Sequence, residues 1–189
     1  EQVSGFSAGD KVYCYNRLEI VQHGSYAEYS IADADMLAPM PASLDYATAA
    51  TIPLTSLTAW QALLGFADLK AGETVFITAG AGGVGGFAIQ LAKYIGARVC
   101  TTAGKHNHEY LLSLGADTVI DYHTEDIDKA VHQFAADGVD VVFDCTGSED
   151  VRVNFDYVKK GRGRVMTING LLHTVPMLDE CGKSYKVKA

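Results

Sequence analysis

The sequence has few cysteines and places them far apart, which limits the sites that they can form. The four are Cys14, Cys100, Cys145 and Cys181, and no C-x-x-C pair occurs. Disulfide-stabilised domains are dense in cysteine, and zinc sites use closely spaced pairs. We therefore expect reduced intracellular thiols, a cytoplasmic protein and no bound metal.

Positive charge and long apolar runs are also scarce. Lys and Arg number 15 against 23 Asp and Glu, which gives a formal net charge of −8 and a pI near 5.1. No apolar run reaches the about 18 residues of a membrane-spanning helix, and no charged-then-apolar leader is present. Nucleic acids and anionic membranes are bound by basic patches. We expect a small-molecule ligand, with no nucleic acid and no membrane as partner.

The most informative stretch is Thr74–Thr102. It opens with the apolar run Val75-Phe76-Ile77, which suits a buried parallel strand, and continues into Gly80-Ala81-Gly82-Gly83-Val84-Gly85, a complete G-x-G-x-x-G. Apolar residues at helical spacing follow as far as Gly96, and Arg98 begins a second strand. Strand, glycine turn, helix and strand form the context in which this motif predicts a dinucleotide site.

Each glycine of the motif has its own expected role. Gly80 permits a tight turn, Gly82 lets backbone N–H groups approach a pyrophosphate, and Gly85 lets the helix pack closely on the strand. The helix N-terminus then offers free N–H donors to phosphate groups. The alternative is a glycine-rich turn that only packs a helix on a sheet.

After this stretch, predicted strands and helices alternate. We expect strands at 118–120, 139–143 and 164–168, and helices at 107–114, 127–135 and 149–160. This alternation predicts an α/β fold with a Rossmann-type, doubly wound parallel sheet, whose ligands bind at the carboxyl ends of the strands. Residues 171–189 show no clear period, and we expect them to be loosely ordered.

The first part of the chain differs. Residues 11–14 and 25–31 predict strands, too few to close a sheet, and the prolines of 38–41 mark a boundary. Beyond it we expect a helix capped by Asp45, and another beginning at Pro53, with Leu54, Leu57, Trp60 and Leu64 on one face. We expect a partial β domain in residues 1–42 and a nucleotide-binding domain in 43–189. Because the chain begins with Glu1 near a strand, we expect a fragment, with the second domain truncated at its C-terminal end.

The end of the second strand favours NADPH over NADH. An NAD site usually has Asp or Glu there to hold the ribose 2′-hydroxyl. Here Thr101-Thr102 is followed by Ala103, Gly104 and Lys105, with no acidic residue before Glu109. Lys105 could pair with a 2′-phosphate, and Tyr122, after the third strand, could donate its hydroxyl. An ordinary solvated lysine and a packing tyrosine are the alternatives.

Several motifs in the same order resemble the zeta-crystallin-like quinone oxidoreductases of the medium-chain dehydrogenase/reductase superfamily. The resemblance covers roughly residues 5–170. The matching pieces are Gly9–Tyr13, Gly24–Tyr29, Ala49–Pro53 with Thr58-Ala59-Trp60, Ala79–Gly85 with Ala88–Ala92, Leu114–Asp117 with Ile120–Tyr122, and Asp144–Gly147.

The resemblance implies a GroES-like β domain, of which residues 1–42 would be a part, and NADPH bound in a cleft beside it. It implies reduction of quinones or α,β-unsaturated carbonyls. By the same resemblance, Thr58 lies near the nicotinamide and pyrophosphate, and Ile168 and Asn169 flank the nicotinamide. The remaining implied contacts are to the pyrophosphate (Gly82, Gly83, Val84), the 2′-phosphate (Thr102, Lys105, Tyr122) and the adenosine (Cys145, Thr146).

Other readings remain open. Zinc alcohol dehydrogenases of the superfamily carry a cysteine-rich lobe that the short connection Tyr15–Gly24 lacks, and His106 and His108 are spaced so that they do not converge on a metal. A zinc-independent enzyme is therefore expected. Tyr13 or Asn16 could donate a proton, but a core tyrosine and a loop asparagine explain them better, and no catalytic acid is assigned. A non-catalytic NADPH-binding protein and an alcohol dehydrogenase-like enzyme are the alternatives. In the full-length protein we expect a homodimer.

Overall fold

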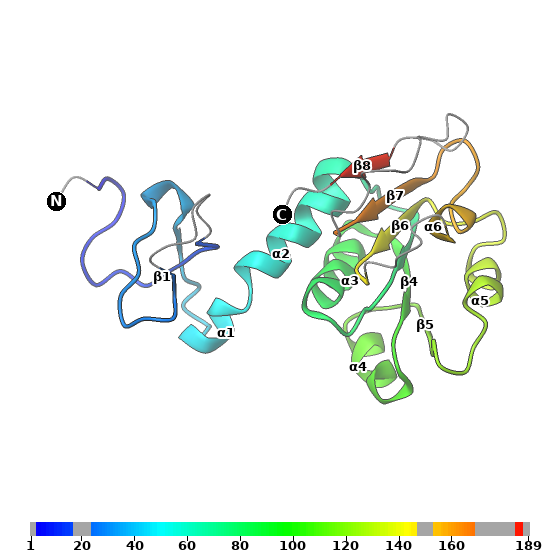
Figure 1. Ribbon diagram of the computed structural model, residues 1–189, viewed down its shortest axis with the longest axis horizontal. Helices are drawn as coiled ribbons and strands as arrows, with labels where there is room; N and C mark the ends of the chain where they lie inside the picture. The colour runs from blue at the N-terminus through cyan, green and yellow to red at the C-terminus, as the bar shows by residue number, and fades with distance from the viewer. Residues whose placement is uncertain (1–2, 17–23, 147–152, 169–183, 187–189) are drawn as a thin grey trace. The chain divides into compact units, whose positions relative to one another are not determined.

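The computed structural model describes residues 3–16, 24–146, 153–168 and 184–186 (Figure 1). The chain divides into two compact units, Glu1–Thr55 and Ser56–Ala189. This division falls later than the boundary expected after residue 42, because the first helix belongs with the N-terminal unit. Among the helices described, none has both the length and the apolar character needed to cross a membrane.

The N-terminal unit has little regular structure. Strand β1 (Val12–Tyr13) pairs antiparallel with β2 (Ala38–Pro39), and a 3₁₀ turn, η1, covers Ala34–Met36. The predicted strand at 25–31 is wrong, since these residues form bends and coil with exposed side chains. Alternating residues form a strand only where a neighbour pairs with them and one face is buried.

Helix α1 (Tyr46–Ala50) confirms the expected cap. The Asp45 carboxylate accepts a hydrogen bond from the Thr48 N–H at 2.7 Å. This bond satisfies one of the N–H groups that a helix leaves unpaired in its first turn.

The second unit is a six-stranded, fully parallel sheet. In space the strands run β5-β4-β3-β6-β7-β8, and each neighbouring pair is parallel. Their bounds are Thr74–Ile77 (β3), Arg98–Thr102 (β4), Thr118–Ile120 (β5), Val141–Asp144 (β6), Arg164–Thr167 (β7) and Ser184–Lys186 (β8). Counted within this unit, the order is 3-2-1-4-5-6, which confirms the Rossmann-type fold. Strand β8 was missed, because it lies in the stretch expected to be loosely ordered.

Helices cover both faces of the sheet (Figure 1). Helix α3 and the segment before β3 pack on one face around Ile89, Leu63 and Val99, and helix α5 packs on the other around Val131 and Phe76. The helices are α2 (Pro53–Trp60), its π-helical continuation η2 (Gln61–Phe66), α3 (Gly83–Ile95), the 3₁₀ turn η3 (Lys105–Asn107), α4 (His108–Ser113), α5 (Ile127–Phe134) and α6 (Val153–Asp156).

The predicted apolar face of the helix from Pro53 is not the buried one. Leu54 and Leu57 are each 45% exposed and Trp60 is 56% exposed, whereas Ala59, Ala62 and Leu63 are fully buried. Small alanine side chains let the helix approach the sheet closely, and the wider π-helical turn after Trp60 shifts which residues face inward.

Paired charges hold the amino edge of the sheet together. Asp140, just before β6, accepts hydrogen bonds from Lys159 at 2.7 and 2.8 Å and from the Thr74 N–H and hydroxyl at 2.9 Å. Arg164, at the start of β7, pairs with Glu73 at 2.6 Å. These contacts tie β3, β6 and β7 together at the edge where the strands begin.

Candidate functional site

The turn after β3 fits only a narrow set of side chains. Ala79 has the left-handed φ of 51°, so the strained residue of the turn is Ala79 and not Gly80. A Cβ on Gly80 would collide with the Thr101 hydroxyl on β4. Two hydrogen bonds fix the turn on β4, from Ala79 N to the Thr102 hydroxyl at 3.1 Å and from Gly80 N to Thr102 O at 3.0 Å.

The start of α3 lies directly against this turn. A Cβ on Gly85 would collide with the Ala79 carbonyl oxygen and lie 2.8 Å from the Gly80 Cα, which confirms the close packing expected of Gly85. Gly82 is the N-cap, and it has no side chain with which to cap the helix. The backbone N–H groups of the first turn, at Gly83 and Val84, are therefore available to a phosphate ligand.

A buried carboxylate organises the neighbouring strand end. Asp144, the last residue of β6, is fully buried, and its Oδ1 accepts from the Thr78 hydroxyl at 2.9 Å and from the Thr146 N–H and hydroxyl at 3.0 and 2.7 Å. The Thr78 hydroxyl in turn accepts from the Cys145 N–H at 2.8 Å. Asp144 thus fixes the ends of β3 and β6 relative to each other, a role that the sequence did not reveal.

Cys145 is a packing residue in this arrangement. Burial raises the pKa of its thiol, and the neighbouring Asp144 carboxylate raises that pKa further. A thiol with a raised pKa stays protonated at neutral pH and is a poor nucleophile.

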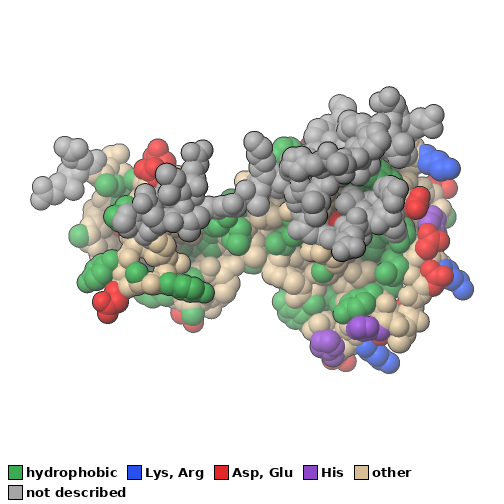
Figure 2. Space-filling model, viewed as in Figure 1, with side chains coloured by type: hydrophobic (Ala, Val, Ile, Leu, Met, Phe, Trp, Pro, Cys, Tyr) green, Lys and Arg blue, Asp and Glu red, His purple; other side chains and the backbone are tan. Residues whose placement is uncertain are grey.

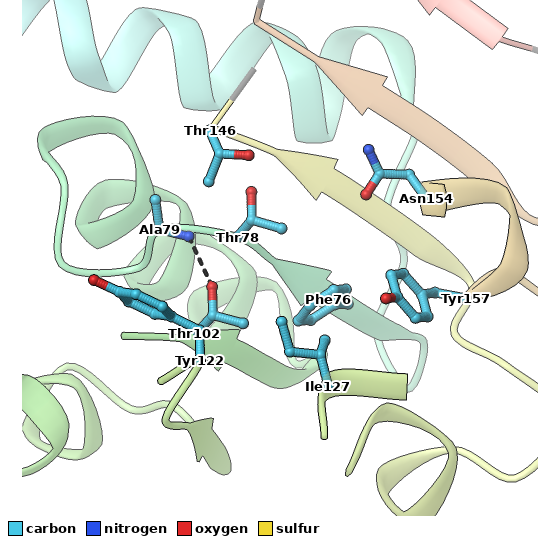
Figure 3. Close-up of a pocket in the computed structure, with 9 residues that line it drawn as sticks. All are labelled: Phe76, Thr78, Ala79, Thr102, Tyr122, Ile127, Thr146, Asn154 and Tyr157. Carbon is cyan, nitrogen blue, oxygen red and sulfur yellow. Dashed lines mark hydrogen bonds between the residues drawn. The ribbon is translucent and has the colours of Figure 1, made fainter. Parts of the chain in front are cut away.

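A cavity of about 420 Å³ opens at the carboxyl edge of the sheet (Figure 3). Its lining includes three of the predicted residues, Thr102, Tyr122 and Thr146. The other described residues that line it were not predicted and are Phe76, Thr78, Ala79, Ile127, Asn154 and Tyr157. Volumes of this order hold small organic ligands.

Thr102, at the end of β4, and Tyr122, after β5, line the cavity. No Asp or Glu follows β4 directly, so β4 contributes no carboxylate to this site. Lys105 is exposed, and no described residue pairs with its ammonium group. Tyr122 is about half exposed, and its ring centroid lies 4.1 Å from that of His123. The Asp121 carboxylate accepts hydrogen bonds from the His123 N–H and the Thr124 hydroxyl within the turn that follows β5. These bonds, chiefly the one from His123, lower the pKa of Asp121.

Thr58 and Ile168 are not among the residues that line the cavity. Thr58 is half-buried on α2, Ile168 follows β7 and packs against the core on the α3 face, and Asn169 falls outside the described residues. In the N-terminal unit, Asn16 donates hydrogen bonds to Ser30 and Ile31, as a structural loop asparagine does.

On the face shown in Figure 2, acidic and basic side chains are interspersed along the right-hand edge. Within the described ranges, no group of three or more His, Cys, Asp or Glu could hold a metal ion. Zinc independence itself stays a prediction.

Comparison with known proteins places this geometry in a family. The family model described as zinc-binding dehydrogenase matches residues 83–180. The NADPH-dependent alkenal/one oxidoreductase of Arabidopsis thaliana is 37% identical over 174 residues, covering 89% of this chain and 43% of the relative. The quinone oxidoreductase of Sus scrofa is 34% identical over 170 residues, covering 89% of this chain and 50% of the relative.

Solved structures agree. The quinone oxidoreductase from Coxiella burnetii superposes with a TM-score of 0.80 at 38% identity, covering 90% of this chain and 51% of that one. An alcohol dehydrogenase superfamily protein from Novosphingobium aromaticivorans gives a TM-score of 0.85 at 35% identity, covering 98% and 56%. This chain spans about half the length of the relatives that it matches.

The family model spans more than half of the chain, and the strand order, the glycine loop and the neighbouring structures agree with it. The chain therefore belongs to the zinc-binding dehydrogenase family of the medium-chain dehydrogenase/reductase superfamily, where it resembles the quinone oxidoreductases.

Proposed function

We propose that this chain forms the cofactor-binding part of an NADPH-dependent reductase that transfers hydride to a quinone or an α,β-unsaturated carbonyl compound. The observation that carries the proposal is the arrangement at the carboxyl edge of the sheet. There Ala79, Thr102 and Tyr122 line one cavity. Helix α3 begins four residues after Ala79, and the exposed Lys105 follows Thr102 by three residues, with no carboxylate between them.

The residues present fit a phosphorylated dinucleotide. The N–H groups of Gly83 and Val84 would hold the pyrophosphate, and the cavity beside Thr102 and Thr146 would take the adenosine half. Lys105 and Tyr122 would bind the 2′-phosphate. Thr58, Ile168 and Asn169 remain proposed neighbours of the nicotinamide.

The nicotinamide, when bound, supplies the hydride. The part played by this chain is to bind and orient the cofactor. The Asp144 carboxylate holds the Thr78 and Thr146 hydroxyls in place, and the contact of Gly85 with Ala79 fixes the phosphate-binding turn. Orientation of the reactants is one of the contributions that a protein makes to hydride transfer.

The names of the relatives support the cofactor and the substrate class. The Arabidopsis relative is named as NADPH-dependent and as acting on alkenals and alkenones, and the Sus scrofa and Coxiella relatives are named quinone oxidoreductases. A homodimer of the whole protein stays a prediction.

Turnover by the full-length protein tests the proposal. NADPH consumption should be followed with an ortho-quinone and a panel of enones, and NADP-dependent oxidation of simple alcohols should be measured in parallel. We expect reduction of at least one quinone or enone, with NADH much less effective. Binding of NADPH without turnover would favour a non-catalytic protein, and alcohol oxidation alone would favour an alcohol dehydrogenase.

A further inference from the structure

The cavity at the carboxyl edge contains a buried amide that the sequence did not mark. Asn154, on α6, is only 5% exposed, and it lines the cavity. Figure 3 shows its side chain projecting from α6 toward the ends of β3 and β6, where Thr78 and Thr146 lie. Among the described residues, its Nδ2 has no hydrogen-bond acceptor.

An unpaired amide N–H at this depth needs a partner. Buried polar groups in folded proteins are nearly always hydrogen-bonded, because leaving one unpaired costs its desolvation energy. An apolar residue at position 154 would avoid that cost. The amide therefore points to a polar atom that enters the cavity with a ligand.

The three threonine hydroxyls that line the cavity already form hydrogen bonds within the protein. The hydroxyls of Thr78 and Thr146 donate to Asp144, and the Thr102 hydroxyl accepts from the Ala79 N–H. These side chains shape the wall, while the amide of Asn154 has a donor left for a ligand.

The shape and chemistry of the walls favour a flat aromatic ligand. Phe76 and Tyr157 meet edge to face, with ring centroids 5.4 Å apart, and Ile127 lines the cavity beside them. Aromatic and aliphatic walls pack well on a flat ring. A purine base has two flat apolar faces that such walls can contact, and its ring nitrogens accept hydrogen bonds.

We propose that Asn154 recognises the adenine of the dinucleotide by donating a hydrogen bond from Nδ2 to a ring nitrogen. The inference rests on the proposed function, since it takes the occupant of the cavity to be the adenosine half of NADPH. It adds a residue that binds the base, in contrast to Lys105, which binds only the 2′-phosphate. Asn154 should therefore contribute equally to NADPH and NADH binding.

Binding measurements on the full-length protein test this role. Calorimetric titrations should compare wild type with Asn154→Leu, using NADPH, NADH, 2′,5′-ADP and reduced nicotinamide mononucleotide, which lacks the adenosine. We expect the variant to lose about fivefold to twentyfold in affinity for the three adenine nucleotides, the range for one hydrogen bond. Affinity for the mononucleotide should not change.

Two further variants separate a hydrogen bond from other effects. Asn154→Ala removes the same donor but leaves a smaller side chain. If the hydrogen bond from Nδ2 is what matters, the affinity of this variant for adenine nucleotides should fall by the same factor as in Asn154→Leu. Gln133→Leu, the same amide-to-leucine change at an exposed position of α5, should alter nothing. The thermal midpoint of ligand-free Asn154→Leu should not fall, because the variant removes an unpaired donor.

The inference fails if Asn154→Leu binds all three adenine nucleotides as wild type does. It also fails if only the leucine variant loses affinity, which would indicate steric blocking, or if the mononucleotide is weakened equally, which would indicate general distortion. A wild-type protein that binds no adenine nucleotide would instead contradict the proposed function, and the two failures are thereby distinguished.

Discussion

At the amino edge of the sheet Asp140 accepts hydrogen bonds from Lys159 and Thr74, and Glu73 pairs with Arg164. At the carboxyl edge of the same sheet the Lys105 ammonium and the Asn154 amide nitrogen have no partner among the described residues. The paired charges of the amino edge stabilise the packing of the strands. Polar groups without a partner in the protein are free to bind a ligand. Mutations at the amino edge should therefore lower stability, and mutations of the unpaired groups at the carboxyl edge should lower cofactor affinity.

The largest effect on the carboxyl edge is expected from Gly85→Ala. The added Cβ would collide with the Ala79 carbonyl and press on Gly80, so the turn and the start of α3 must move apart. We expect a loss of about 1–3 kcal/mol in the free energy of unfolding, as for an overpacked core, and cofactor binding too weak to detect.

Gly86→Ala is the matched control for this variant. At Gly86 a Cβ would meet its nearest neighbour, Leu114, at 3.6 Å, which is ordinary contact. This variant should keep both its stability and its cofactor affinity, measured by urea unfolding and by NADPH fluorescence. Equal losses in the two variants would contradict the close-packing account of the turn.

A cofactor-selective loss is expected from Lys105→Ala. A charged hydrogen bond to the 2′-phosphate is worth about 1.5–3 kcal/mol, so NADPH should bind about tenfold to a hundredfold more weakly while NADH barely changes. Lys160→Ala, at an exposed lysine of the amino edge, serves as control and should change neither affinity. A similar loss for both cofactors would remove Lys105 from the phosphate site.

At the amino edge, Asp140→Asn should cost stability without costing affinity. It leaves the Lys159 ammonium, whose side chain is only 21% exposed, without its charged partner, and we expect a loss of about 2 kcal/mol in unfolding free energy. Asp68→Asn, in an exposed pair with Lys70, should change stability by less than about 0.5 kcal/mol. A fall in NADPH affinity for Asp140→Asn would show that the two edges are coupled.

The smallest effect is the pH dependence of the stabilisation that Asp140 provides through its contacts with Lys159 and Thr74. Burial alone would raise the pKa of Asp140, but the hydrogen bonds from Lys159 and Thr74 outweigh burial and hold that pKa below the ordinary value of 3.8. The stabilisation is therefore complete above the ordinary pKa and is lost as the pH falls from there through the lowered pKa.

Urea unfolding of wild type and Asp140→Asn between pH 7 and pH 3 checks this. The difference between the two in unfolding free energy should be constant near neutrality and should shrink below about pH 4. A difference that grows with acidification would reverse the sign assigned to Asp140.

The sequence predicted the central fold well because its signals are local. The strand from Val75, the motif from Gly80 to Gly85 and the left-handed Gly96 that ends α3 are each specified by neighbouring residues. The parallel, Rossmann-type sheet follows from their alternation, whereas the order of its strands came from the structure.

Most of the misses depend on contacts between residues that are distant in the sequence. Strand β8 forms by pairing with β7, and the segment 25–31 lacks such a partner despite its alternating pattern. Within the site, the bonds of Asp144 to Thr78 and Thr146 and the position of Asn154 depend on how strand ends and α6 come together. No spacing in the sequence encodes those distances, so the glycine turn before α3 could be predicted and the cavity wall that includes Asn154 could not.

The most direct test of the account is a fluorescence titration of this chain with NADPH and with NADH. The carboxyl edge, with Lys105 beside the carboxylate-free end of β4, predicts that NADPH binds at least about tenfold more tightly, the value of one charged hydrogen bond to the 2′-phosphate. Equal affinity for the two cofactors would contradict the assignment of this edge as an NADPH site.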